Sequence, residues 1–201
     1  MIETDIYYNI AKTGEGQYRE KMSRFLAFAY KVKSAEEARE RIKKMQNEYH
    51  DARHVCWAYM IGANGEDWQL NDNGEPSGTA GKPILGQIRS AEVTDVVVCV
   101  VRYFGGIKLG TSGLIQAYRE AARLALEDAG RRICYRCREI EVRVGYVCLD
   151  GVMRIARSEG VEILEQEFDN VCRLVLRVQE SRLPEVTGLL GKIEGVEIYE
   201  R

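Results

Sequence analysis

Two glycine-rich segments carry most of the residues in this chain that are suited to holding an anion. The first, residues 71–88, is NDNGEPSGTAGKPILGQI, and the second, residues 102–118, is RYFGGIKLGTSGLIQAY. Each combines glycines, hydroxyl side chains and a lysine with an apolar stretch of helical spacing. Free N–H groups at the start of a helix attract anions, and glycine lets the backbone approach a ligand closely. The pattern predicts two helix starts that face one cleft and hold a phosphate-bearing ligand.

The residues that we expect to bind an anion or a nucleic acid all lie in these two segments. Lys82, Lys108 and Arg102 would supply positive charge, while glycine N–H groups and hydroxyl groups would supply directional donors. The full candidate set is Glu75, Ser77, Gly78, Thr79, Gly81, Lys82, Arg102, Tyr103, Gly105, Gly106, Lys108, Gly110, Ser112 and Gly113.

An alternative explanation of both segments is purely structural. Glycine is used most often for its backbone conformation, so each loop can simply turn the chain and cap a helix. Ser77 or Thr79 is positioned to cap the first helix, and the second helix is predicted to begin at about Ser112. Neither segment matches a nucleotide fingerprint, because Pro83 follows the Gly-Lys pair where a P-loop needs Ser or Thr. Both explanations stay open, and nucleotide hydrolysis of the P-loop type is not expected.

A second group of candidates concerns catalysis. His54 and Cys56 alternate on a predicted strand, so their side chains share one face and could form a base–nucleophile pair, with Asp72 as a further base. The simpler interpretation is that His54 packs in the sheet. Likewise Asp72 and Glu75 would accept hydrogen bonds from loop N–H groups or face water rather than hold Mg²⁺. We therefore assign no catalytic residue and keep His54, Cys56 and Asp72 as candidates.

The six cysteines are scattered, several of them inside apolar runs, which favours reduced and packed thiols over a disulfide framework. Cys134 and Cys137 have the spacing of half a zinc site, with Cys148 and Cys172 as possible further ligands. A second close pair is missing. We therefore predict no metal and no cofactor, and the role of the Cys134/Cys137 pair stays open.

Bulk composition describes an ordinary globular protein. The 201 residues are 45% hydrophobic and 30% charged, with a formal net charge of −2, so there is no global basic surface for nucleic acid, although a local patch is compatible with it. No apolar run approaches the length of a membrane span, and the N-terminus lacks the basic flank of a signal peptide. We expect a cytoplasmic protein without a membrane partner, and its oligomeric state stays open.

The elements that must position the candidate residues form two domains of an α+β protein, 1–136 and 137–201. The first is predicted to be a two-layer α/β domain with a turn at Gly14–Gly16 and a polar domain boundary at 131–139. Its strands are predicted over 5–12, 17–32, 53–62 and 95–104, and its helices over 34–50 and 114–130. The second alternates as strand, helix, strand, strand, helix, strand, which is the ferredoxin-like βαββαβ order.

Three blocks of the first domain carry a family resemblance: RHVCWAYMIG, NDNGEPSGTAGKPIL and VVVCVVRYFGGIKLGTSGLIQAYREAA. In sequence, order and spacing they resemble the YigZ/IMPACT family, and 137–201 resembles the second domain of its bacterial members. The resemblance implies that the first domain is similar to a fold shared by a small-subunit ribosomal protein and domain IV of elongation factor G. It implies that the second is similar to domain V of the same factor.

The resemblance also implies contact with RNA or the ribosome. The leading hypothesis is a cytosolic regulator, linked to translation or stress, that binds RNA, the ribosome or another phosphate-bearing ligand through the two glycine-rich loops. Tyr103 and Tyr118 would be available to stack on a base. One alternative is an enzyme acting on a small phosphorylated or acyl substrate in the same cleft. Another is a protein-interaction module, for which an exposed apolar patch near Trp57 or Trp68 would be the sign.

Overall fold

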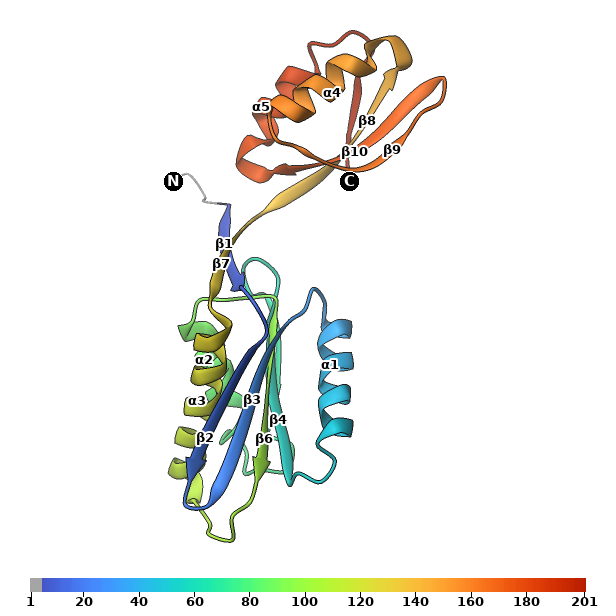
Figure 1. Cartoon of the computed structure of the whole chain (residues 1–201). Helices are drawn as coiled ribbons and strands as arrows, with labels where there is room; N and C mark the ends of the chain where they lie inside the picture. The colour runs from blue at the N-terminus through green and yellow to red at the C-terminus, as the bar shows by residue number, and fades with distance from the viewer. Residues whose placement is uncertain (1–4) are drawn as a thin grey trace. The chain divides into compact units, whose positions relative to one another are not determined.

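The computed structural model describes residues 5–201 (Figure 1). Contacts within the chain divide it into two compact units. One unit is Tyr7–Cys134, called here the N-terminal unit. The other consists of Tyr135–Arg201 together with Asp5 and Ile6, and is called here the C-terminal unit. Each unit has its own hydrophobic core.

A five-stranded antiparallel sheet forms the centre of the N-terminal unit, in the order β2-β3-β6-β4-β5. The strands are β2 (Gly14–Glu20), β3 (Ser23–Lys31), β4 (His54–Ile61), β5 (Asp67–Asn71) and β6 (Val96–Tyr103). The helices are α1 (Ala35–Glu48), α2 (Gly81–Ser90) and α3 (Gly110–Ala129). Figure 1 shows α1 on one face of the sheet and α2 with α3 on the other.

The predicted two-layer arrangement is therefore wrong, because helices cover both faces of this sheet. Along β6, Val96, Val98 and Val100 join the core beneath α2 and α3, whereas the alternate residues Val97 and Cys99 join the core beneath α1. All of these side chains are fully buried. A strand that is apolar on both faces gains about 1.5–3 kcal/mol for each large side chain only when both faces are covered.

The predicted turn at Gly14–Gly16 is also wrong, because both glycines lie inside β2. A Cβ at Gly14 would lie 2.1 Å from the carbonyl oxygen of Ala125 in α3, and one at Gly16 would lie 2.5 Å from the Ala125 nitrogen. These glycines allow the helix to pack directly on the strand. The turn between β2 and β3 is instead at Lys21 and Met22, which have φ values of 43° and 71°.

Two further elements were not expected. They are β5, which follows β4 as an edge strand, and β7 (Arg131–Tyr135). β7 pairs in a separate two-stranded sheet with β1 (Ile6–Ile10), which lies within the strand predicted over 5–12. The segment 131–139, predicted as a polar boundary, thus contains β7 and the start of β8 (Cys137–Gly145). The arginines made this segment look like a polar linker, although it contains β7, whose partner β1 lies more than a hundred residues earlier in the chain.

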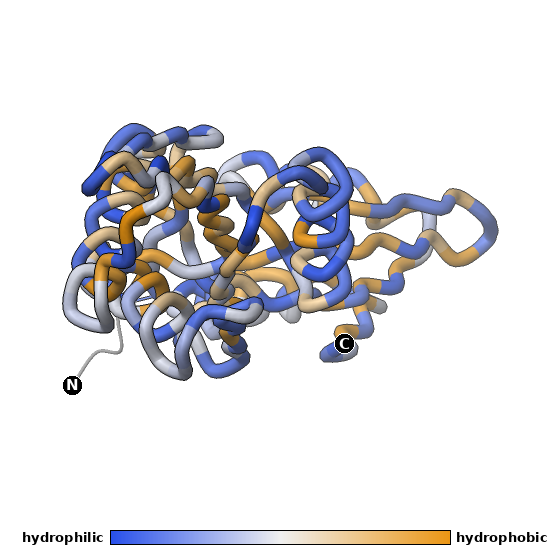
Figure 2. The backbone as a smooth tube through the Cα atoms, turned by 90° about the horizontal axis from the view of Figure 1, so that it is seen from below, coloured by the Kyte–Doolittle hydropathy of each residue, from blue (hydrophilic) through white to orange (hydrophobic). Residues whose placement is uncertain are grey.

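The C-terminal unit has the predicted βαββαβ order, with short 3₁₀ turns at Tyr146–Cys148 and Glu180–Arg182. Its elements are β8, α4 (Leu149–Ser158), β9 (Glu162–Glu167), β10 (Val171–Gln179), α5 (Leu183–Leu190) and β11 (Glu197–Glu200). The sheet order is β11-β8-β10-β9 and every pair is antiparallel. Figure 2 shows the expected partition, with hydrophobic stretches along strands and helices and hydrophilic residues in the turns.

Candidate anion-binding site at the start of α3

A cavity of about 460 Å³ lies where β6 ends, β4 begins and α3 starts; we call it the α3 pocket. It combines side chains from four segments that are distant in sequence, because the start of β4, the loop at 75–76, the end of β6 and the start of α3 meet at one end of the sheet. Its lining residues are Arg53, His54, Glu75, Pro76, Arg102, Phe104, Lys108, Leu109, Gly110, Thr111 and Leu114.

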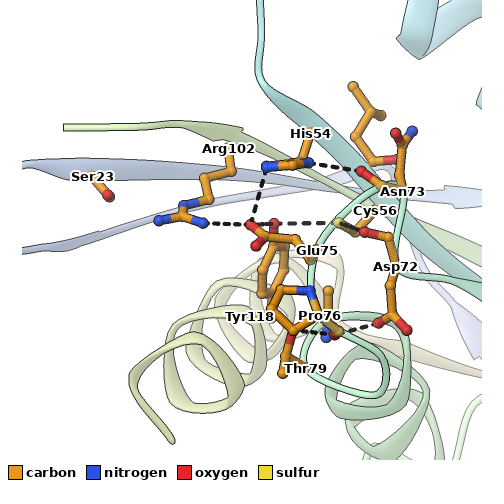
Figure 3. Close-up of polar contacts among 12 residues, drawn as sticks. Ser23, His54, Cys56, Asp72, Asn73, Glu75, Pro76, Thr79, Arg102 and Tyr118 are labelled. Carbon is orange, nitrogen blue, oxygen red and sulfur yellow. Dashed lines mark hydrogen bonds and ion pairs between the residues drawn. The ribbon is translucent and has the colours of Figure 1, made fainter. Parts of the chain in front are cut away.

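A buried carboxylate lies at the base of the α3 pocket (Figure 3). The Glu75 side chain is only 3% exposed, and its Oε1 atom accepts hydrogen bonds from Arg102 Nη1 at 2.5 Å and from the Tyr118 hydroxyl at 2.9 Å. His54 Nε2 lies 3.8 Å from the same oxygen. A buried carboxylate is tolerated only when it is paired and hydrogen-bonded. Glu75 therefore serves to hold Arg102 and Tyr118 in place.

Arg102 is held rigidly but retains unused donor capacity. Its side chain is 6% exposed, and its guanidinium carbon lies 5.5 Å from the ring centroids of both Phe25 and Phe104. Its Nε atom has no hydrogen-bond partner among residues 5–201. A fixed guanidinium with an unsatisfied donor strengthens the positive potential of the α3 pocket.

His54 is oriented by the backbone. Its Nδ1 atom lies 2.7 Å from the carbonyl oxygen of Asn73, and since a carbonyl only accepts, Nδ1 must be the donor. Nε2 then faces Glu75 and the α3 pocket. The imidazole is thereby fixed at the wall of the pocket.

The structure argues against the predicted base–nucleophile pair. Cys56 Sγ donates its single thiol proton to the Asp72 carbonyl oxygen at 3.0 Å, lies 3.3 Å from the Tyr118 hydroxyl, and is not bonded to His54. Burial raises the pKa of the Cys56 thiol to about 12. Burial and the neighbouring Cys56 and Glu75 likewise raise the pKa of Tyr118, so its hydroxyl remains a donor. Cys56 is therefore a neutral, packed thiol at physiological pH.

The start of α2 is already occupied by a carboxylate of the chain itself. Asp72 accepts hydrogen bonds from the N–H groups of Gly78 at 2.8 Å, Ala80 at 3.0 Å and Gly81 at 2.8 Å. The prediction that Ser77 or Thr79 caps this helix is wrong, since the Thr79 hydroxyl donates to the Pro76 carbonyl instead. Asp72 thus fills the position that an anionic ligand would take at α2.

The start of α3 is different. The helix begins at Gly110, two residues before the predicted Ser112, and no side chain among residues 5–201 caps its first turn, which also carries no acidic residue. Gly110 has a φ of 72°, and a Cβ there would meet nothing within 4 Å. Lys108 lies just ahead of it in the same pocket lining. These N–H groups are available to an external anion.

The predicted residues therefore do not meet in a single cleft. His54, Glu75, Arg102, Lys108 and Gly110 line the α3 pocket. Gly78 and Lys82 line a separate groove of about 520 Å³ between α2 and α3. Tyr103 lines a third cavity, and Tyr118 is fully buried. The hypothesis of two helix starts aimed at one ligand is wrong because Asp72 already satisfies the start of α2.

Other placements complete the predicted set. Gly105 packs against the backbone of Met22, where a Cβ would lie 2.1 Å from the carbonyl carbon, and Gly106 has a positive φ with open space around it. Ser77 and Ser112 are exposed, and Gly113 is half-buried. Sequence reasoning missed Arg53, Phe104 and Thr111 as lining residues. All three lie inside the quoted sequence blocks, next to residues that were predicted, and this was the only available signal.

The remaining candidates concern a metal site, a membrane-spanning helix and an apolar patch near Trp57 or Trp68. Among residues 5–201 no group of His, Cys, Asp or Glu side chains is arranged to hold a metal ion, and all six cysteines are free. Within the same residues, no helix combines the length and apolarity needed to cross a membrane. Trp57 is half-buried and stacked on Tyr59, and the more exposed Trp68 is covered on one ring face by Arg89.

Comparison with known proteins shows that this chain is similar to members of one protein family. Residues 21–126 match the family model described as the Impact N-terminal domain. An IMPACT family member from Haemophilus influenzae is 35% identical over 165 residues, covering 81% of this chain and 80% of that protein. IMPACT family member YigZ from Escherichia coli is 31% identical over 173 residues, covering 85% of each chain.

A solved crystal structure of a hypothetical protein is similar to the whole chain. It has a TM-score of 0.77 at 27% sequence identity and covers 96% of both chains. The similarity thus extends over both units.

Proposed function

This chain belongs to the IMPACT family, and on that premise we propose that it is a cytoplasmic regulator linked to translation or stress that binds RNA or the ribosome through the α3 pocket. The bound group would be a phosphate. We further propose that the two units resemble domains IV and V of elongation factor G, an expectation that a direct superposition tests. A protein partner, on or off the ribosome, is compatible with this role.

The observation that carries the proposal is the uncapped start of α3 beside Arg53 and Lys108, two cations that have no carboxylate partner among residues 5–201. Its first-turn N–H groups, the exposed side chains of Arg53 and Lys108 and the fixed guanidinium of Arg102 surround one cavity. Glu75, the one carboxylate in the cavity lining, is already neutralised by Arg102. A phosphate oxygen would gain directional N–H bonds as well as charge.

Salt dependence provides the test. Each phosphate contact releases counterions, so the logarithm of the binding constant falls linearly with the logarithm of the salt concentration. For short RNA oligonucleotides measured by fluorescence anisotropy, Lys108→Ala and Arg53→Ala should each weaken binding and lower the slope by about 1. The loss should be similar across RNA sequences, since phosphate contacts carry no sequence information.

Lys43→Ala is the matched control. Lys43 is an exposed lysine on α1, which covers the opposite face of the sheet. It changes the net charge by the same amount and should leave the slope unchanged. Equal effects of Lys43→Ala and Lys108→Ala would mean that binding responds only to overall charge, and salt-independent binding, or none, would refute the proposal.

A further inference from the structure

Phe104 is an exposed aromatic side chain that lies between two cavities. Its side chain lines the α3 pocket and also a cavity of about 490 Å³ beside the β2–β3 turn, which we call the hairpin cavity. The hairpin cavity is further lined by Arg19, Glu20, Lys21, Met22, Arg24 and Tyr103. Phe104 remains 48% exposed. A large apolar side chain that is exposed at the junction of two cavities marks a surface suited to binding a ligand.

The position of Phe104 is rigidly defined. It directly follows the last residue of β6, and the next residue, Gly105, is packed against the Met22 backbone so closely that no Cβ would fit. The Gly105 N–H donates to the Ser23 hydroxyl at 3.3 Å. The Arg102 guanidinium, itself held by Glu75, lies 5.5 Å from the ring centroid. The ring is thus a supported surface rather than the tip of a free loop.

Cations flank this ring on both sides. The α3 pocket contributes Arg53, Lys108 and the start of α3, and the hairpin cavity contributes Lys21 and Arg24. All four side chains are exposed. Arg24 stacks over the Tyr103 ring at 4.8 Å, and no carboxylate among residues 5–201 pairs with any of the four. Positive charge, an apolar ring and positive charge therefore follow one another along this edge of the sheet.

We infer that Phe104 is a base-stacking platform and that the ligand class is single-stranded nucleic acid. This inference rests on the proposed function and narrows it. One phosphate would lie at the start of α3 and another near Lys21 and Arg24, with the intervening base on Phe104. A base can reach an aromatic side chain only when it is unpaired, so a duplex would make the phosphate contacts without the stacking contact. Exposed Met22, which lines the hairpin cavity, would add apolar contact beside the base.

The occupant follows from charge complementarity. An apolar peptide would bury Phe104 and Met22 but would leave the surrounding cations without partners. A single strand of nucleic acid matches both the apolar ring and the cations, because it carries flat bases alongside anionic phosphates. Stacking is sequence-tolerant, so the site should accept any base at this position.

The test compares single-stranded RNA with the same RNA in a duplex, using 2-aminopurine as the reporter base. Binding of the single strand to the full chain should change 2-aminopurine emission, and the duplex should bind more weakly. Phe104→Ala should weaken single-strand binding roughly 5- to 150-fold. It should leave the salt slope and the duplex affinity unchanged. Phe104→Trp should retain the affinity.

Phe104→Leu guards against misfolding, because it keeps apolar volume over Arg102 but removes the aromatic face. It should behave as Phe104→Ala in RNA binding with an unchanged thermal midpoint. If RNA binds with its Lys108-dependent salt slope but all Phe104 variants bind like the wild type, the stacking inference is wrong and the proposed function stands. If the wild-type chain binds no RNA, or binds without Lys108 dependence, both are wrong.

Discussion

At the scale of single residues, the site is organised around Glu75. One buried carboxylate fixes Arg102 through an ion pair and Tyr118 through a hydrogen bond, and it faces His54. The Tyr118 hydroxyl in turn lies 3.3 Å from the Cys56 sulfur. Side chains that were candidates for catalysis or base stacking thus form the packed base of a pocket. The groups available to a ligand are its outer residues, Lys108 and Phe104 among them.

Removal of the Glu75 charge should destabilise the N-terminal unit strongly. Glu75→Gln keeps the shape but leaves the buried Arg102 guanidinium without its counter-charge, and breaking a buried pair in this way costs about 3–5 kcal/mol. Urea unfolding followed by tryptophan fluorescence measures it, since Trp57 and Trp68 both lie in that unit. The matched control is Glu120→Gln, which breaks a part-exposed pair with Arg123 and should cost under about 1 kcal/mol. Equal losses would contradict this account of Glu75.

At the scale of elements, the two glycine-rich loops have different functions despite similar composition. The first loop folds over Asp72, whose carboxylate satisfies the N–H groups at the start of α2. The second loop leaves the start of α3 uncapped and places Gly105 against the β2–β3 turn. Only the second helix start is therefore open to a ligand.

Asp72→Ala should remove the hydrogen-bond acceptor of the α2 start. Caps of this kind contribute about 0.5–2 kcal/mol, so a loss near the upper end is expected for a carboxylate that serves three N–H groups. Ser77→Ala is the control, because Ser77 is exposed and does not cap the helix, and its effect should be close to zero. Urea unfolding curves of both variants measure the difference. A larger loss for Ser77→Ala would restore the hydroxyl-cap prediction.

At the scale of the whole molecule, two units with separate cores account for the chain, and the family similarity spans both. The candidate site lies entirely in the N-terminal unit. The C-terminal unit presents paired charges on its sheet, where Glu141 is bonded to Arg143 and Arg173 at 2.8 Å each. Glu141 is itself buried, so these bonds form a partly buried charge cluster in which the carboxylate is paired rather than left alone. The hydrophobic core of each unit carries most of its folding free energy.

Stability of the N-terminal unit should fall in alkaline solution. Burial raises the pKa of the Cys56 and Cys99 thiols to about 12, while an unfolded thiol titrates at about 8.5. Below about pH 8.5 the thiols are protonated in both the folded and the unfolded state, so their full contribution to stability is present. Between about 8.5 and 12 only the unfolded chain loses these protons, so stability falls by up to about 1.4 kcal/mol per pH unit for each thiol.

Urea unfolding at pH 7, 8, 9 and 10 under reducing conditions tests this expectation. Cys99→Ala should lower the overall stability but make the alkaline decline shallower, because one of the two buried thiols is gone. A stability that is the same at pH 7 and pH 10 would contradict the assignment of these thiols as buried and neutral.

Much of the architecture follows from local sequence patterns. The continuous apolar run of β6 is typical of a central strand, and Ser34 followed by Glu37 is the pattern of a helix start, at the point where α1 begins. The alternation after residue 137 indicated the βαββαβ order. Such signals are local, because the spacing of apolar residues that marks a strand or a helix can be recognised within the residues of that element. β7 was not predicted, because its strand conformation depends on pairing with the distant β1 and not on the composition of β7 itself.

The sequence by itself determined the family, the presence of α/β and βαββαβ parts, and the two loops in which a site had to be sought. Only the tertiary structure decided that helices cover both faces of the first sheet and that Asp72 fills one helix start. It also decided that Lys82 and Lys108 line different cavities and that Phe104 stands exposed between two groups of cations. The physical reason is that composition shows which groups are able to bind an anion. Whether those groups are free depends on partners that are brought to them only by folding.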